Sequence, residues 1–187
     1  AWRQYVGGVT ACDDWLPEGG SSPAALQGVA ELVEELSDQL AGGLVNDVLN
    51  DVLNTLTVIV ACGTGATLAG LLAGMQGRGR LIGIAALKNA DYLRAEIALL
   101  LQQAGYPAYD NYELLTDFHH GGYAKAPPVL RQFCLDFSTE TGIVIEPVYT
   151  GKMFYALHQL AEAGKFHHDE RVVAIHTGGL QGARGFI

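Results

Sequence analysis

The most informative segment of the sequence reads Thr57-Val-Ile-Val-Ala-Cys-Gly-Thr-Gly-Ala-Thr-Leu-Ala-Gly-Leu-Leu-Ala-Gly74. Its apolar, β-branched run at residues 58–60 is typical of a strand that is buried on both faces of a parallel sheet. The run breaks at residues 63–67, and small residues then continue as a predicted helix from Leu68 to about Met75. The segment therefore predicts a strand, a glycine turn and a helix in direct succession.

The glycine turn is a candidate binding site for a phosphate. In the first turn of a helix the N–H groups lack helical partners, and the helix dipole favours an anion there. Gly63 and Gly65 would let the backbone approach the anion closely, and Thr64 and Thr67 would add hydroxyl donors. Such turns are common in α/β proteins, so a purely structural role fits this turn equally well when it is taken alone.

The composition indicates a globular chain that binds neither nucleic acid nor a membrane. Its 187 residues are enough for one sizeable domain, and 49% of them are hydrophobic. The net charge is −9 without a basic cluster, which argues against binding to nucleic acid or to an anionic membrane surface. No apolar run reaches membrane-spanning length, and no signal peptide is evident. A phosphate ligand would therefore be held by local N–H groups.

The placement of cysteine and histidine predicts no metal site. Cys12, Cys62 and Cys134 are widely spaced, which predicts reduced thiols in a reducing compartment and hence a cytoplasmic protein. Cys62 ends the predicted buried strand and is expected to be a core thiol, not a nucleophile. The adjacent His119 and His120 lack carboxylate companions, so they do not form a convincing ligand set.

The remaining chain repeats the order of strand and helix. Upstream, Ser22 is the predicted N-cap and Pro23 the first residue of a helix that ends at Gly42-Gly43. This alternation predicts an α/β fold with a parallel, helix-covered sheet. Further strands are predicted at residues 80–86, 143–148 and 171–176, with an additional candidate at 112–115, and helices at 90–104, at 128–139 and up to about 163.

Three loops follow the predicted strands at the edge where such sheets bind ligands. The carboxyl ends of parallel strands lie together, and ligands bind beside them. Residues 62–67, 149–152 and 177–179 carry hydroxyls, glycines and a lysine there, in contrast to the apolar strands before them. Their convergence favours a ligand that bears a phosphate over a purely structural role for the glycine turn.

Four motifs together resemble one enzyme family. They are Pro17-Glu-Gly-Gly-Ser-Ser22, Ala61-Cys-Gly-Thr-Gly-Ala-Thr-Leu-Ala-Gly70, Glu146-Pro-Val-Tyr-Thr-Gly-Lys-Met153 and His176-Thr-Gly-Gly-Leu180. In this order and spacing they are similar to the pyridoxal-phosphate enzymes of the D-cysteine desulfhydrase and 1-aminocyclopropane-1-carboxylate deaminase family, which have the tryptophan-synthase-β-like fold (fold type II). The resemblance implies that residues 17–187 form an incomplete large cofactor domain and that residues 1–16 are a remnant of an upstream segment.

The resemblance also implies roles for individual residues. Tyr149 and Tyr123 match two active-site tyrosines near substrate and cofactor, and are the implied catalytic residues. The hydroxyl of Thr177 matches the group that faces the pyridine nitrogen of pyridoxal phosphate, which leaves that nitrogen unprotonated. The implied cofactor-binding residues are Gly63, Thr64, Gly65, Ala66 and Thr67 at the phosphate, together with Thr150 and Thr177.

One departure from the family pattern concerns lysine. Family members form a Schiff base between the cofactor and a lysine on an N-terminal segment, and a serine–asparagine pair of the smaller domain grips the substrate. Both would lie before the Pro-Glu-Gly-Gly loop, and only 16 residues precede that loop here. The lysines present are Lys88, Lys125, Lys152 and Lys165, and none stands in that context. We therefore expect the chain to be the C-terminal part of such an enzyme.

The function implied by the resemblance is a lyase or deaminase. It would act on a small amino acid, D-cysteine or 1-aminocyclopropane-1-carboxylate, and would release ammonia and a 2-oxo acid. A second hypothesis is a non-catalytic remnant that binds the cofactor or a phosphate without turnover. A third is a nucleotide-binding domain, which is disfavoured because Leu68 stands where the third glycine of Gly-x-Gly-x-x-Gly is needed. Exposed strand edges in an incomplete sheet predict self-association or a homodimer.

Overall fold

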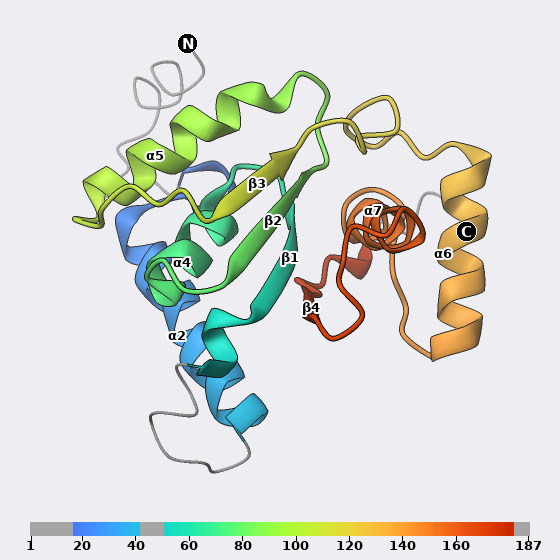
Figure 1. Ribbon diagram of the computed structural model, residues 1–187. Helices are drawn as coiled ribbons and strands as arrows, with labels where there is room; N and C mark the ends of the chain where they lie inside the picture. Colours follow the sequence, from blue (N-terminus) through green and yellow to red (C-terminus); the bar gives the residue numbers. More distant parts are fainter. Residues whose placement is uncertain (1–16, 42–50, 182–187) are drawn as a thin grey trace, which may run out of the picture.

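The fold is a parallel sheet between two layers of helices (Figure 1). The computed structural model describes residues 17–41 and 51–181. The predicted remnant at residues 1–16, Cys12 within it, and the predicted helix stop at Gly42-Gly43 lie outside the described residues. Within the described part the strand order is β3-β2-β1-β4, with β1 paired in parallel to both β2 and β4. The strands are β1 (Leu56–Cys62), β2 (Arg80–Ala85), β3 (Tyr112–Leu115) and β4 (Arg171–Ile175).

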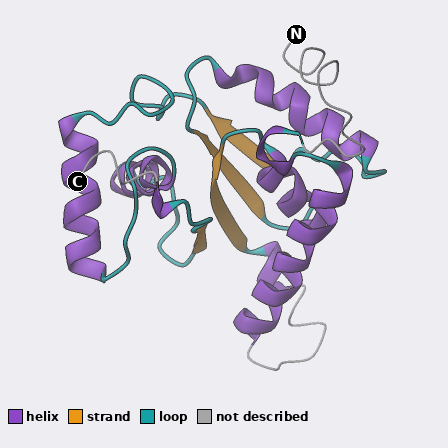
Figure 2. Ribbon diagram, turned by 180° about the vertical axis from the view of Figure 1, so that it is seen from behind, coloured by secondary structure: helices purple, strands orange, loops and turns teal. Residues whose placement is uncertain are grey.

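The helices divide between the two faces of the sheet, as the views from front and back show (Figures 1 and 2). One layer contains α4 (Ala66–Met75), α5 (Leu93–Gln103) and, outside them, α2 (Pro23–Ala41). The opposite layer contains α7 (Thr150–Glu162) and, beyond it, α6 (Pro128–Thr141). Two short 3-10 helices, η1 (Glu18–Gly20) and η2 (Ala90–Tyr92), precede α2 and α5. The predicted α/β architecture is thereby confirmed.

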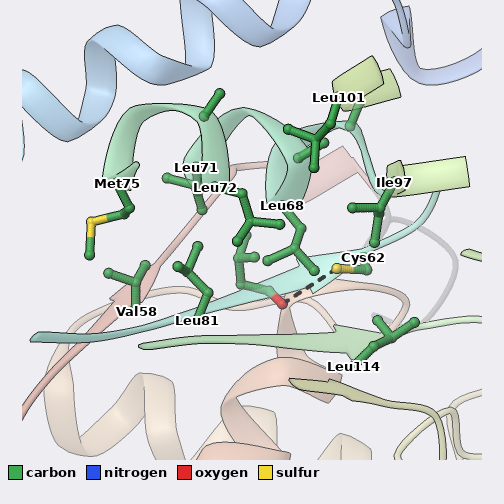
Figure 3. Close-up of a cluster of buried hydrophobic side chains, with 14 of the residues drawn as sticks. Val58, Cys62, Leu68, Leu71, Leu72, Met75, Leu81, Ile97, Leu101 and Leu114 are labelled. Atoms are coloured by element: carbon green, nitrogen blue, oxygen red, sulfur yellow. Dashed lines mark hydrogen bonds between the residues drawn. The ribbon is translucent and has the colours of Figure 1, made fainter. Parts of the chain in front are cut away.

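The central strand β1 supplies both cores because its side chains alternate between the two faces. Val58 and Cys62 face the α4 layer, where they meet Leu68 and other leucines (Figure 3), and Val60 belongs to the same cluster. Ile59 and Ala61 belong to the second cluster, on the side of α7. All seven residues of β1 are buried, which explains why its sequence is a continuous apolar run and not an alternating one.

The outer helix α2 packs closely on α4 because two glycines of α4 have no side chain. A Cβ atom at Gly70 would lie 2.4 Å from Cβ of Val29, and one at Gly74 would lie 2.7 Å from Cγ2 of Val33. At the start of α2, the N–H of Ala25 donates to Oγ of Ser22 at 3.3 Å, so the predicted N-cap is confirmed.

The strand predicted at residues 143–148 is wrong. This segment is a loop, and β3, only a candidate from the sequence, occupies the position beside β2. Pro147 has no N–H for a strand ladder, and Ile143 and Val144 are 50% and 55% exposed. The buried carboxylate of Glu146 instead receives N–H groups at the start of α7. The apolar run therefore leads into a helix cap.

The described helices also bear on membrane association. None of those in residues 17–41 and 51–181 is long and apolar enough to cross a membrane.

Candidate functional site

A pocket of about 800 Å³ opens at the carboxyl end of β1 and β2. Its wall includes the loop from Pro17 to Ser21, the glycine turn after β1, and Ala86 just after β2. Leu87, Tyr123 and Tyr149 also line the pocket, and residues of η2 and α5 form a further side: Tyr92, Leu93, Glu96, Leu99, Leu100 and Gln103. The pocket thus lies at the edge of the sheet where the parallel order predicts a ligand.

The glycine turn has the geometry of an anion site. Gly65 is the N-cap of α4 with φ of +83°, and no side chain caps this helix end. The first helical hydrogen bond runs from the N–H of Ala69 to O of Gly65 at 2.9 Å, so the N–H groups of Ala66, Thr67 and Leu68 have no partner within the helix. A Cβ at Gly65 would also lie 2.8 Å from Cγ1 of Ile97. Both the backbone angle and the space therefore require glycine here.

The Pro-Glu-Gly-Gly-Ser loop closes over this turn. Oγ of Ser21 donates a hydrogen bond to Oγ1 of Thr64 at 2.7 Å, across 43 residues of sequence. A Cβ at Gly19 would lie only 2.9 Å from Cγ2 of Thr64. Two of the motifs that carried the resemblance are thus in direct contact, and their hydroxyls face one pocket.

Tyr149 lies over the turn from the opposite layer. Its hydroxyl donates to the main-chain O of Ala61 at 2.7 Å, and its ring is 3.5 Å from the position of a Cβ at Gly63. Burial, with the nearby Cys62 thiol, raises the pKa of Tyr149 well above its usual range. The phenol is therefore neutral and fixed in place. Tyr123, by contrast, is 72% exposed at the mouth of the pocket.

Glu146 is a buried acid whose role the sequence did not suggest. Its carboxylate accepts the N–H groups of Val148, Tyr149 and Thr150 at 2.6, 2.9 and 2.6 Å. The hydroxyl of Thr150 also donates to Glu146, at 3.1 Å. These bonds satisfy donors at the start of α7 and thereby orient Tyr149. The sequence does contain a signal for this helix cap, namely an acidic residue followed by Pro-Val-Tyr-Thr and then by a helical pattern.

The predicted site residues separate into two groups. Thr150 is fully buried against Glu146 and does not line the pocket. Thr177 is exposed in the turn after β4, at the same sheet edge, but it is not part of the pocket wall either. The cofactor roles of both remain predictions. The residues that the structure brings to the pocket are Gly63, Thr64, Thr67, Tyr123 and Tyr149, with Gly65 and Ala66 buried in the turn itself.

Among residues 17–41 and 51–181, no cysteine or histidine lines this pocket. Cys62 is buried, and burial raises the pKa of its thiol to about 12, so it is a core thiol as predicted. His176 is satisfied, with its ring nitrogens 3.0 Å from O of Val144 and 2.9 Å from the N–H of Gly178. Across the described residues no group of three or more histidine, cysteine, aspartate or glutamate side chains could hold a metal.

A parallel α/β sheet with an uncapped helix start, a glycine turn and converging hydroxyls is typical of phosphate-binding α/β domains. Similarity to known proteins makes this assignment more specific. The chain belongs to the family of pyridoxal-phosphate dependent enzymes, since the model of that family matches residues 12–178.

Several known proteins are similar to this chain. Two are named "Putative 1-aminocyclopropane-1-carboxylate deaminase": one from Pyrococcus horikoshii, 34% identical over 67% of this chain, and one from Pyrococcus abyssi, 31% identical over 89%. The bifunctional D-cysteine desulfhydrase/1-aminocyclopropane-1-carboxylate deaminase of Arabidopsis thaliana is 29% identical over 67% of this chain. The matches cover 40%, 50% and 32% of these three relatives, so the chain spans at most about half their length.

A solved structure of an ACC deaminase homologue has the same fold. The two superpose with a TM-score of 0.74 at 30% identity, over 91% of this chain and 50% of that chain. The family's cofactor fits the present site at its phosphate end, because the turn supplies free helix N–H groups and two glycines that admit a close anion. The four lysines all lie in the described part, and none of them lines the pocket.

Proposed function

We propose that this chain forms the phosphate-binding part of a pyridoxal-phosphate dependent lyase or deaminase of small amino acids. The proposed substrates are D-cysteine or 1-aminocyclopropane-1-carboxylate, and the products are ammonia and a 2-oxo acid. The observation that carries the proposal is the uncapped start of α4 at Gly65, in a pocket that two tyrosines and the Ser21–Thr64 pair enclose.

The residues of this chain would bind and orient, and would handle protons. N–H groups of the glycine turn and the hydroxyls of Thr64 and Thr67 would hold the phosphate of the cofactor. When bound, pyridoxal phosphate supplies an electron sink for bonds at the α-carbon of the amino acid. Tyr149, fixed by Ala61, would present a neutral phenol beside the turn, while Tyr123 would face the substrate side.

A specific observation supports a second candidate function. Lys88, Lys125 and Lys165 are exposed, and Lys152 is buried outside the pocket wall. The described residues that line the pocket can therefore bind the cofactor through its phosphate, but they offer no amine for a covalent link. The alternative is therefore a phosphate-binding or cofactor-binding protein without turnover.

Titration with pyridoxal phosphate and with pyridoxal tests the site. If the glycine turn binds the phosphate, pyridoxal should bind at least about tenfold more weakly than pyridoxal phosphate, because hydrogen bonds to a charged group are stronger than those between neutral groups. A matched variant is Thr67→Val, which removes one hydroxyl from the turn and keeps its shape. Equal binding of the two ligands would contradict a phosphate site.

Reduction with borohydride separates the two functions. Intact-mass spectrometry of the complete polypeptide that contains this chain, after addition of pyridoxal phosphate, should show a stoichiometric adduct for the enzyme and none for the non-covalent binder. Release of ammonia and 2-oxo acid from each of the two amino acids then identifies the substrate, and sulfide is produced only from D-cysteine. Self-association as a homodimer and a cytoplasmic location complete the proposal, and a sizing experiment tests the former.

A further inference from the structure

Lys152, in the first turn of α7, is the largest side chain among the fully buried residues. Its Nζ donates hydrogen bonds to two main-chain oxygens, that of Ala86 at 3.0 Å and that of Gly122 at 2.7 Å. A buried ammonium is costly unless it is hydrogen-bonded, and these two carbonyls satisfy it in part. The sequence placed Lys152 outside the context of the family's Schiff-base lysine and gave it no other role, so this burial needs a reason.

One carbonyl group belongs to a residue of the pocket wall, and the other to a residue directly before one. Ala86 directly follows β2 and lines the pocket, and Gly122 directly precedes Tyr123, which lines it too. The N–H of Lys152 itself donates to O of Tyr149 at 3.2 Å. One residue therefore joins the end of the central sheet, the loop that carries Tyr123 and the helix start that carries Tyr149.

The loop around Tyr123 receives this bond from α7 at Gly122. Its other main-chain bonds are local: the N–H of Gly121 donates to Nδ1 of His119 at 2.9 Å, and the N–H of Gly122 to O of His119 at 3.0 Å. The N–H of Lys125 shares O of Gly122 at 3.2 Å. Gly121 and Gly122 have φ of +100° and +118°, angles that only glycine adopts readily. The loop is thus bent by its own sequence, and Lys152 links it to the sheet.

A second contact joins the same loop to α7. The ring of His120 packs edge-on against Tyr155, with centroids 4.7 Å apart and planes at 82°. This contact places the loop beside the helix, but it does not reach the carbonyl before Tyr123. The bond to that carbonyl from outside the loop comes from Lys152, whereas that from the N–H of Lys125 is local.

We propose that Lys152 is a positioning residue that holds Tyr123 at the pocket by binding the carbonyl before it, and that it is not an attachment point for the cofactor. The proposal rests on the function proposed above for its effect on substrate. It concerns the substrate side of the pocket, since the Nζ of Lys152 donates to the oxygens of Ala86 and Gly122 and to none of the glycine-turn residues 63–67. Removing the ammonium should free Tyr123 and leave the glycine turn in place.

The charge on Lys152 depends on its surroundings. Burial lowers the pKa of Lys152 to about 8, and the nearby Glu146 acts in the opposite direction. The other titratable groups around it are His120 in the loop, whose pKa burial lowers, Lys88 beside Gly122, and Tyr149, whose pKa burial raises. Lys152 should therefore lose its charge in mildly alkaline solution while its two Nζ bonds become weaker.

Hydrogen exchange in Lys152→Met provides the main test, with Lys165→Met as the control for an exposed lysine. The amides of Gly121, Gly122 and Lys125 should exchange about tenfold to a hundredfold faster in Lys152→Met, as expected for loss of a charge-assisted hydrogen bond. The same amides should be unchanged in Lys165→Met. Equal protection in Lys152→Met and the parent protein would overturn the proposal.

A second measurement needs no variant, and so remains decisive if Lys152→Met does not fold. In the parent protein the protection of these amides, corrected for base-catalysed exchange, should decrease between about pH 7 and pH 9.5. Constant protection over this range would contradict the proposal. Neither measurement needs a ligand, so failure of the proposed function would leave their outcome interpretable.

Kinetics then tests the link to substrate. In protein with measurable turnover, Lys152→Met should raise KM for the amino acid by about tenfold and change kcat less, with the affinity for the cofactor phosphate retained. An unchanged KM would show that Tyr123 needs no such anchor. A borohydride-reducible adduct on Lys152 would refute the second half of the proposal.

Discussion

The hydroxyl of Tyr149 and the main-chain oxygen of Ala61, 88 residues apart in the sequence, are joined by a hydrogen bond of 2.7 Å. Ala61 is the penultimate residue of β1, and Tyr149 is the residue before α7. The bond therefore ties the strand that leads into the glycine turn to the helix layer on the other face. It also fixes the Tyr149 ring relative to β1.

Tyr149→Phe tests this bond. The change leaves the oxygen of Ala61 without its phenol partner, so the free energy of unfolding should fall by about 1 kcal/mol in urea denaturation. Tyr112→Phe, on the edge strand β3, is a matched control and should change stability less. If the free energy of unfolding falls equally in both variants, the hydrogen bond to Ala61 does not contribute specifically to stability.

Gly65→Ala should damage the turn in two ways at once. Gly65 has φ of +83°, and the added Cβ would meet Ile97 at 2.8 Å. We expect a loss of about 1–3 kcal/mol in stability, and weaker binding of pyridoxal phosphate or inorganic phosphate. Calorimetry and ligand titration measure the two effects. Gly105→Ala has a similar φ of +80° and open space around it, so it separates backbone strain from the clash.

Two glycine-to-alanine substitutions in helices should change the stability of the protein in opposite directions. At Gly70 in α4 a Cβ would lie 2.4 Å from Val29, so Gly70→Ala should destabilise the protein by about 1–3 kcal/mol. At Gly28 in α2 nothing lies within 4 Å, so Gly28→Ala should stabilise it by about 0.5–1 kcal/mol through helix propensity. Thermal unfolding of the pair checks both. A stable Gly70→Ala would mean that α2 does not pack tightly on α4.

Glu146→Gln should loosen the start of α7. The carboxylate accepts three N–H groups and one hydroxyl, and an amide can accept on one oxygen only. The expected loss is about 1–3 kcal/mol in the free energy of unfolding. Glu140→Gln, at an exposed position of α6, should be neutral. Equal stability of the two variants would argue against the cap.

The two described cysteines predict how stability changes at high pH. Burial raises the pKa of the Cys62 and Cys134 thiols from 9.0 to about 12. Above pH 9 the unfolded chain loses these protons before the folded protein does, so their contribution to stability is complete below pH 9 and declines as the pH rises towards 12. In Cys62→Ala the decline between about pH 9 and pH 10 should be less steep. Labelling followed by peptide mapping should find both thiols unreactive at neutral pH until the protein unfolds.

The sequence correctly predicted the parts of the fold that are determined by residues close to one another in the chain. The strand at residues 58–60, the glycine turn after it and the Ser22 cap all follow from apolar runs, glycine and capping chemistry. The apolar run at 143–148 misled because its outcome depends on Pro147 and on a buried Glu146, which turn it into a helix cap. An apolar run alone does not distinguish these outcomes.

The sequence predicted those site residues whose position follows from a local backbone motif. It did not predict the residues whose position depends on contacts with distant parts of the chain. Gly63, Thr64 and Thr67 were expected at the pocket, and the structure places them there. The burial of Lys152 depends on carbonyl groups 66 and 30 residues away, and no local pattern indicates such partners. Thr150 was expected in the pocket beside Tyr149, but Glu146 holds its side chain away from the pocket wall.

The central place of β1 in the sheet has a consequence for assembly. In the described part, β1 is flanked on both sides, by β2 and by β4, while β3 and β4 form the outer edges. Additional strands, from the same polypeptide or from another copy, can extend the sheet at either edge without displacing the turn that follows β1. The position of the glycine turn is therefore set by the centre of the sheet and does not depend on what is added at its edges.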